Sequence, residues 1–127
     1  MAQSHRIFIA FAIEDESYRD FLVGQARNNR SPFSFTDMSV KQPWSEQWKT
    51  NCRTKIRGCD GTIALLSHNT YGADGARWEI KCTVEERIPL LPVRIHSDQA
   101  APYTPELDDR RIVYWTWENI ANWLNRL

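Results

Sequence analysis

The run RIFIAF at residues 6–11 sets the architecture of the chain. Apart from its leading arginine the run is continuously apolar. This is typical of a parallel strand buried on both faces, because a half-exposed strand would alternate apolar and polar residues. Residues 14–29 then carry apolar side chains at helical spacing, with acidic residues at the front and Arg27 near the end, as the helix dipole favours. A buried strand followed by an amphipathic helix is one βα unit.

The same alternation continues along the chain. Ser45 is a suitable N-cap for a second helix, which is predicted to carry four side chains on one face: Trp48, Cys52, Ile56 and Cys59. Residues 88–93 form an apolar run with two prolines, so this strand is expected to be short or near an edge. Residues 96–109 lack helical periodicity and predict an irregular crossover. Further strands are predicted at 33–36, 62–66 and 111–115, and further helices at 76–87 and 117–127.

This order of elements predicts an α/β fold of the flavodoxin-like, doubly wound type. Its sheet is expected to hold about five parallel strands in the order 2-1-3-4-5. In such a sheet the ligand crevice opens at the carboxyl ends of the strands, beside the first strand, where the order reverses. The segments expected there are 11–15, 37–44 and 67–75, with the front of the third helix. A chain of 127 residues has room for a single domain, spanning 1–127.

Charge and cysteine content narrow the class of protein. Sixteen basic and sixteen acidic residues cancel, so the composition supplies no basic surface for nucleic acid. No segment has the pattern of a signal peptide or the length of a membrane span, so we expect a cytoplasmic protein without a membrane partner. The cysteines, Cys52, Cys59 and Cys82, are odd in number and fit no zinc spacing. We expect them to be reduced and buried.

Several motifs of nucleotide-binding and signalling α/β proteins are missing. Residues 11–14 close the first strand without a glycine, which excludes the Rossmann fingerprint, and there is no Walker glycine loop. A phosphorelay receiver would need an aspartate after the third strand and a lysine after the fourth. Ser67 and Arg94 stand near those places instead. The three histidines share no spacing with carboxylates, so no metal site is expected.

Glu79 is the carboxylate best placed for chemistry. If Ile80 and Val84 face the core, Glu79 points about 100° away, toward the mouth of the crevice. The helix dipole would favour its charged form, whereas the neighbouring Trp78 would oppose it. The alternative is a solvated glutamate at the front of a helix.

Three other residues at this edge have a functional and a structural interpretation. Trp44, outside any apolar periodicity, could cover a nucleotide base or pack on the neighbouring helix. Asp37 could contact a ligand or act as a turn residue at the end of its strand. Ser67, which closes the third predicted strand, could contact a ligand or cap a turn.

Three stretches together resemble the TIR-like family. They are RIFIAFAIED at 6–15, FTDMSVKQPW at 35–44 and CDGTIALLSHNTYGADGARWEIKCTVEERIPLLPV at 59–93. More narrowly, they resemble the bacterial TIR-like proteins related to the ThsB component of Thoeris anti-phage defence. The likeness covers residues 6–95, and its most specific part is SHNTY followed by WEI, in which the glutamate occupies the family's catalytic position.

The resemblance implies an activity and a set of site residues. Catalytic TIR domains cleave NAD between nicotinamide and ribose, and Thoeris-type members convert the ADP-ribosyl part into a cyclic or conjugated signal for a separate effector protein. NAD is then a substrate, and no cofactor is needed. By this likeness Glu79 is the catalytic carboxylate, and the substrate would be bound by Phe11 and Ala12 of the first-strand loop, Asp37 and Trp44 of a covering loop, Ser67 at the pocket floor and Trp78 beside the glutamate.

The same resemblance leaves alternatives open. Many TIR domains act only as interaction modules, and a nucleoside deoxyribosyltransferase-like enzyme would use its glutamate as a covalent nucleophile on a related architecture. TIR active sites are frequently completed across subunits, so a homo-oligomer is one of the arrangements that the resemblance allows. The segment after the second strand is short compared with the loop through which many TIR domains assemble, and Phe11-Ala12 stands where many catalytic relatives have a small polar residue.

Overall fold

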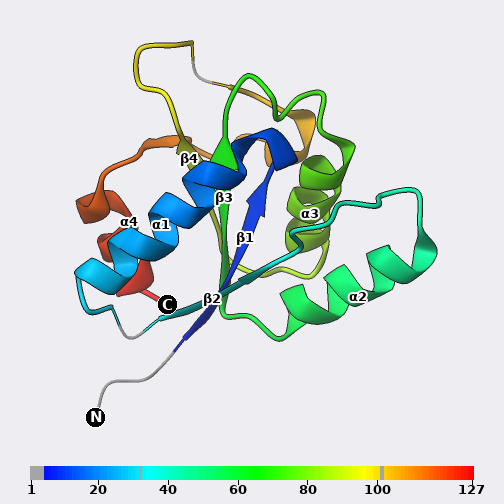
Figure 1. The fold of residues 1–127 in the computed structure, drawn as a ribbon, viewed down its shortest axis with the longest axis horizontal. Helices are drawn as coiled ribbons and strands as arrows, with labels where there is room; N and C mark the ends of the chain where they lie inside the picture. Colours follow the sequence, from blue (N-terminus) through cyan, green and yellow to red (C-terminus); the bar gives the residue numbers. More distant parts are fainter. Residues whose placement is uncertain (1–4, 32, 101) are drawn as a thin grey trace.

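A parallel sheet of order β2-β1-β3-β4-β5 forms the centre of the molecule (Figure 1). The computed structural model describes residues 5–31, 33–100 and 102–127. The predicted flavodoxin-like fold and strand order are confirmed. The strands are β1 (Arg6–Phe11), β2 (Ser34–Asp37), β3 (Gly61–Leu66), β4 (Leu90–Arg94) and β5 (Val113–Tyr114). The helices are α1 (Glu16–Asn28), α2 (Glu46–Arg57), α3 (Asp74–Glu85) and α4 (Trp117–Leu124), with two short helical turns, η1 (Ile13–Asp15) and η2 (Pro105–Leu107).

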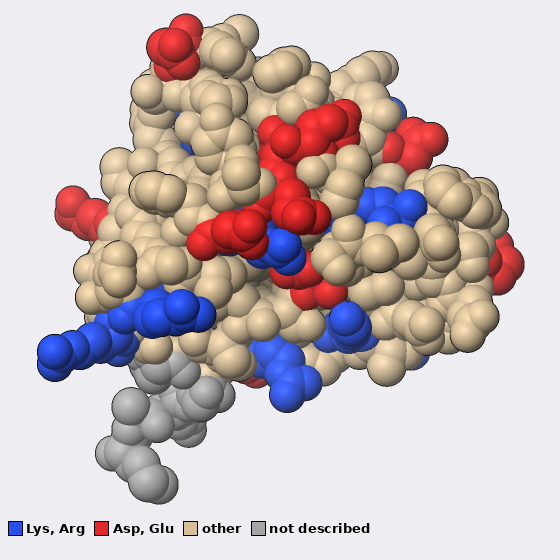
Figure 2. Space-filling view, viewed as in Figure 1, with Lys and Arg blue, Asp and Glu red and all other residues tan. Residues whose placement is uncertain are grey.

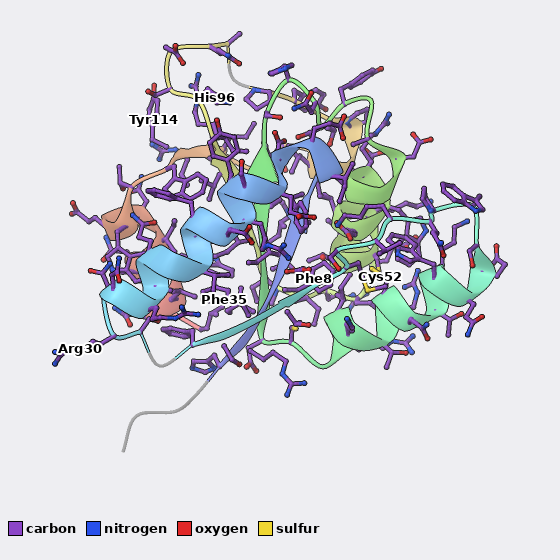
Figure 3. All side chains as sticks on the ribbon, viewed as in Figure 1. Phe8, Arg30, Phe35, Cys52, His96 and Tyr114 are labelled. Atoms are coloured by element: carbon purple, nitrogen blue, oxygen red, sulfur yellow. The ribbon has the colours of Figure 1, made fainter. Side chains whose placement is uncertain are left out.

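The sheet is covered on both faces. α1 and α4 pack on one face, against Ile7, Ile9 and Phe11 of β1, whereas α2 and α3 pack on the other, against Phe8 and Ala10. Phe8 and Cys52 lie in the layer between the sheet and α2 (Figure 3). Both sets of β1 side chains are fully buried or nearly so. The unbroken apolar run of this strand follows from burial on both sides.

The irregular crossover and the proline-containing strand agree with the sequence prediction. Between β4 and β5 the only helical segment among the described residues is η2. β4 lies inside the sheet, but the short β5 pairs only with Val93 and Arg94. Pro92 therefore meets no ladder partner on that side, where its missing N–H would otherwise cost a hydrogen bond.

The cysteines are free and buried, as predicted. Cys59 follows the end of α2, so it does not belong to that helix. Burial raises the pKa of the Cys59 and Cys82 thiols to about 11, and it also raises that of Cys52. The thiols are therefore protonated near neutral pH and serve as small apolar groups.

Surface charge, helix hydropathy and possible metal ligands are three features that bear on what the chain binds. Acidic side chains gather near the middle of one face of the molecule, over the front part of α1, with basic side chains toward its lower edge (Figure 2). No helix within the described residues has the length and hydropathy needed to span a membrane. Among those same residues, no group of three or more His, Cys, Asp or Glu side chains is arranged to hold a metal ion.

Alanine substitutions at two glycines test the packing, and they are expected to change the free energy of unfolding in opposite directions. A Cβ added at Gly61 would lie 2.5 Å from Cη2 of Trp123, whereas at Gly24, inside α1, nothing lies within 4 Å. We expect Gly61→Ala to lower the free energy of unfolding by about 1–3 kcal/mol, because the indole must move. Gly24→Ala should raise it by about 0.5–1 kcal/mol, since alanine restricts the unfolded chain. Urea denaturation measures both, and a Gly61→Ala midpoint equal to that of the parent protein would refute the packing argument.

Candidate functional site

Glu79 lies at the carboxyl edge of the sheet, but its side chain is buried. None of its surface is exposed, so the expectation that it points toward an open crevice is wrong. The buried side of α3 is formed by Ala76, Glu79, Ile80 and Thr83, and Val84 is only half-buried. The phase differs from the predicted one because this side includes polar residues. Thr83, for example, donates a hydrogen bond from Oγ1 to the backbone oxygen of Glu79 (2.9 Å) and lies 3.0 Å from Oγ1 of Thr62.

Lys41 covers Glu79. Its Nζ lies 2.7 Å from Oε2 of Glu79, and only 9% of the lysine side chain is exposed. The same Nζ stands 3.9 Å from the centroid of the Phe11 ring, which is a cation–π contact. An ammonium group is therefore held between a carboxylate and an aromatic face.

The local fold explains how Lys41 reaches this place. The segment after β2, residues 38–45, crosses α3 before α2 begins (Figure 1). Trp48 Nε1 donates a hydrogen bond to the Val40 oxygen (2.6 Å), and Ser45 caps α2 by accepting from the Trp48 backbone N–H (3.2 Å). A Cβ added at Gly75 would lie 3.0 Å from Cβ of Lys41, so this glycine leaves room for the lysine stem at the front of α3.

The surroundings of Glu79 shift its ionisation. Burial raises the pKa of this carboxyl from 4.5 to about 7, and the charge and hydrogen bond of Lys41 oppose the rise. The backbone amide of Phe11 also favours the charged form. No donor in the described part of the chain reaches Oε1 in hydrogen-bond geometry. One oxygen of this buried carboxylate is thus left free to accept a bond from a ligand or water.

Phe11 and Ala12 are both buried at the end of β1 and the start of the following turn. The Phe11 ring contacts Lys41, and the Arg19 guanidinium lies 5.3 Å from its centroid. The Ala12 oxygen accepts a hydrogen bond from the Asp15 amide (2.8 Å). The structure therefore brings Phe11 to the Glu79 site through Lys41.

Asp37 ends β2 and is held by α1. Its Oδ2 lies 2.7 Å from Nη1 of Arg19, and its backbone oxygen accepts a hydrogen bond from Lys55 Nζ (3.1 Å). Asp37 and Arg19 also line a cavity of about 630 Å³ between α1 and β2. The carboxylate is thus engaged with Arg19 beside that cavity.

Ser67 belongs to a buried network. Its Oγ donates a hydrogen bond to Oδ2 of Asp15 (2.5 Å) and accepts one from the Asn69 amide (3.0 Å). Asn69 Nδ2 donates to the other Asp15 oxygen (3.0 Å). Asp15 and Ser67 are both almost completely buried. The network ties the β1–α1 loop to the β3–α3 loop at the edge where Glu79 lies.

Loss of the Ser67 hydroxyl should weaken this tie. We expect Ser67→Ala to lower the free energy of unfolding by about 1.5–3 kcal/mol, because a buried carboxylate loses a donor. Ser17→Ala, at an exposed position of α1, should change it by no more than about 0.5 kcal/mol. Guanidinium denaturation compares the two, and equal midpoints would mean that water replaces the hydroxyl without cost.

The two tryptophans predicted at the site lie in different surroundings. Trp44 is 77% exposed on the segment that carries Lys41. Trp78 packs on the α2 side of α3, with its ring centroid 5.6 Å from that of Trp48 and Arg53 over its face at 5.4 Å. The Trp78 side chain points toward α2, whereas that of the next residue, Glu79, points toward Lys41.

Sequence reasoning missed Lys41. Its ion pair joins residues 38 positions apart, from an irregular segment to a helix. No periodicity reports such a contact. The one sequence signal was the position of the lysine in the segment predicted to lie at the carboxyl edge.

Fold and site define a class of protein. A parallel sheet of order 2-1-3-4-5, with a carboxylate on α3 at its carboxyl edge, is a flavodoxin-like domain of the TIR type. The chain belongs to the family described as Thoeris protein ThsB, TIR-like domain, whose model matches residues 8–100. The resemblance noted in the sequence is thereby confirmed.

Solved structures support the same fold. A crystal structure of a prokaryotic SEFIR domain is similar, with a TM-score of 0.58 and 12% sequence identity, covering 96% of this chain and 94% of that one. At this identity the likeness concerns the fold alone. A comparison with curated protein sequences finds no match.

Proposed function

We propose that this chain is an enzyme that cleaves NAD, releases nicotinamide and makes an ADP-ribose-derived, cyclic second messenger in anti-phage defence. Membership of the ThsB TIR-like family supports a role in defence. The observation that carries the enzymatic part is the buried Glu79 carboxylate, which faces a cation position bounded by the Phe11 ring.

The chemistry requires a group that stabilises positive charge. When the bond between ribose C1′ and the nicotinamide nitrogen breaks, the electron pair leaves with nicotinamide, which becomes neutral. The ribose gains oxocarbenium character, and a fixed carboxylate stabilises that charge more in the transition state than in the ground state. Nicotinamide needs no proton to leave, so one carboxylate suffices where most glycosidases use two.

In the second step of the proposed reaction, a new bond at ribose C1′ replaces the bond to nicotinamide. A nitrogen of the adenine ring attacks C1′ and loses a proton in the cyclic product, whereas attack by water gives ADP-ribose and a proton. In both cases one bond to C1′ is lost and one is formed. Exclusion of water from the site therefore decides how much cyclic product forms. The burial of Glu79 supports a site with restricted access to water.

Glu79 is suited to this role because the site already stabilises a cation. The Lys41 ammonium stands 2.7 Å from the carboxylate and 3.9 Å from the Phe11 centroid. The same two groups would face the charge that develops on the ribose. In this proposal Ala12, Asp37, Trp44, Ser67 and Trp78 remain candidate substrate contacts, with Trp78 on the side of α3 that faces α2.

Partners follow from the same proposal. The product would act on a separate effector protein, in the cytoplasm, where NAD is present. Exposed apolar side chains stand on the segments after the first four strands: Ile13, Val40, Trp44, Tyr71 and Tyr103. Such side chains at one edge of the sheet support contact with a second copy of the chain.

The experiment is direct identification of the products. The purified protein is incubated with NAD, dilute and at high concentration, and nicotinamide and ADP-ribose-derived products are identified by mass spectrometry. We expect nicotinamide and a cyclic product in equal amounts. Covalent sugar on the peptide that carries Glu79 would instead support a deoxyribosyltransferase-like reaction.

A non-catalytic interaction module is the second candidate. It is favoured by one observation: Lys41 covers Glu79, and the carboxylate has no exposed surface. This candidate predicts that no nicotinamide is released at any protein concentration and that partner binding is unchanged when Glu79 is replaced.

A further inference from the structure

We propose that Lys41 is a displaceable plug, whose ammonium occupies the position that the cationic part of NAD takes in the reaction. The segment 38–45 must then carry the lysine out before cleavage. The inference rests on the proposed function and adds a means of regulation to the same site.

The contacts of the ammonium define a site for a cation. A carboxylate oxygen lies 2.7 Å from Nζ, and the face of the Phe11 ring lies beneath it at 3.9 Å from the centroid. A carboxylate and an aromatic face together also bind a flat pyridinium ring, since both attract positive charge. A pyridinium and the Lys41 ammonium cannot occupy this place together, so binding of one requires departure of the other.

The proposal requires that the segment carrying Lys41 can be displaced, and its contacts bear on this. Lys41 is 9% exposed, but its neighbour Val40 is 63% exposed and Trp44, three residues on, is 77% exposed. Within the segment, Met38 packs against the core on the α2 side of the sheet, whereas Val40 and Trp44 bury little apolar surface. Two hydrogen bonds hold the segment near Lys41. Trp48 Nε1 donates to the Val40 oxygen, and the Ser45 amide donates to the Gln42 oxygen (2.9 Å) in a turn. Residues 38–45 belong to no strand or helix, so displacement of Lys41 would break no hydrogen bond of the sheet.

Removal of the plug should uncover the cation position. The probe is 1-methylnicotinamide, a pyridinium cation that has no ribose and therefore cannot be cleaved by the proposed reaction. We expect Lys41→Ala to bind it at least about tenfold more tightly than the parent protein does. The double variant Lys41→Ala with Glu79→Gln should lose this gain, since the carboxylate is the attracting group. Titration calorimetry at about pH 9 measures the binding, because loss of the Lys41 charge raises the pKa of Glu79 further and the carboxyl must be ionised to attract the cation. Lys49→Ala, which removes a partly exposed lysine of α2, is the matched control and should bind as the parent protein does.

Kinetics provide the second readout. Lys41→Ala should release nicotinamide from NAD with a KM lowered at least about fivefold, because NAD no longer competes with the lysine. Lys41→Gln, which keeps a donor toward Glu79 without the charge, should behave in the same direction and replaces the alanine variant if that variant does not fold. Thermal unfolding checks the fold of each protein.

The outcomes separate the plug from the enzyme. If pyridinium binding tightens but neither protein releases nicotinamide, the plug holds and the proposed activity fails. If nicotinamide release depends on Glu79 but both Lys41 variants bind pyridinium no better and show an unchanged or higher KM, the plug is overturned while the activity holds. Loss of nicotinamide release in both Lys41 variants, with unchanged binding, also overturns it, since Lys41 would then assist the reaction.

Discussion

Replacement of Glu79 by glutamine is expected to reduce the rate of nicotinamide release from NAD at least about a hundredfold. Glutamine has nearly the same shape and can still accept the hydrogen bond that Lys41 Nζ donates at 2.7 Å. It lacks the negative charge that, in the proposed reaction, faces the ribose as the glycosidic bond breaks. Loss of one preorganised electrostatic group costs about two to three powers of ten in rate. Initial rates at saturating NAD, followed by chromatography of nicotinamide, measure the effect.

A matched variant shows whether the effect belongs to the site. Glu85→Gln removes a carboxylate from the same helix, at a side chain that is 47% exposed and paired with Arg53. It should release nicotinamide at the parent rate. If Glu79→Gln also keeps that rate while both variants are fully folded under the assay conditions, Glu79 has no part in catalysis.

The strands and their order could be predicted because burial on both faces leaves a plain sequence signal. β1 and β3 have unbroken apolar runs, and a strand of that kind belongs inside a covered parallel sheet. The βα alternation then restricts the topology to few arrangements. Element boundaries depend on pairing that the sequence does not show: the last predicted strand, 111–115, is reduced to Val113–Tyr114, because β5 pairs only with the end of β4.

The direction of Glu79 could not be predicted because polar groups occupy the buried side of its helix. Hydropathy at Ile80 and Val84 suggested a phase that places Glu79 outward. Thr83 and Glu79 face inward instead, each with a polar partner, Thr62 for one and Lys41 for the other. A hydropathy pattern cannot register a polar residue whose burial depends on a partner far along the chain.

The position of Glu79 at the sheet edge, in contrast, followed from topology alone. The carboxyl ends of parallel strands meet at one edge, and α3 starts there after the β3 loop. The sequence thus places Glu79 at the sheet edge. The charge and burial of its neighbours, which govern its ionisation, become known only from the contacts of the folded chain.

The ionisation of Glu79 should make activity and stability depend on pH in opposite directions. Burial raises the pKa of this carboxyl to about 7, so the charged form that the proposed reaction requires is lost as pH falls below that value. We expect nicotinamide release to fall about tenfold per pH unit below pH 7. The pH dependence of kcat/KM between pH 5 and pH 9, from rates at NAD concentrations well below KM in buffers of constant ionic strength, checks this, because kcat/KM reports the ionisation of the free enzyme.

The effect on stability has the reverse sign. Between pH 4.5 and about 7 the folded protein keeps a proton on Glu79 that the unfolded chain has already lost. The folded state binds more protons, so the contribution of this group to the free energy of unfolding is present in full below pH 4.5 and is lost as pH rises through about 7. The loss amounts to about 3 kcal/mol, since each unit of pKa corresponds to about 1.4 kcal/mol.

Comparison with Glu79→Gln isolates this contribution. The other titrating groups are common to both proteins, so the difference between their free energies of unfolding follows Glu79, with Lys41 and Asp37 as the charged groups that act on it. The glutamine variant should gain about 3 kcal/mol relative to the parent protein between pH 4.5 and pH 8. Urea denaturation at both pH values measures the change. A constant difference would mean that Glu79 keeps an ordinary pKa, and the fall of activity below pH 7 would then have to come from another group.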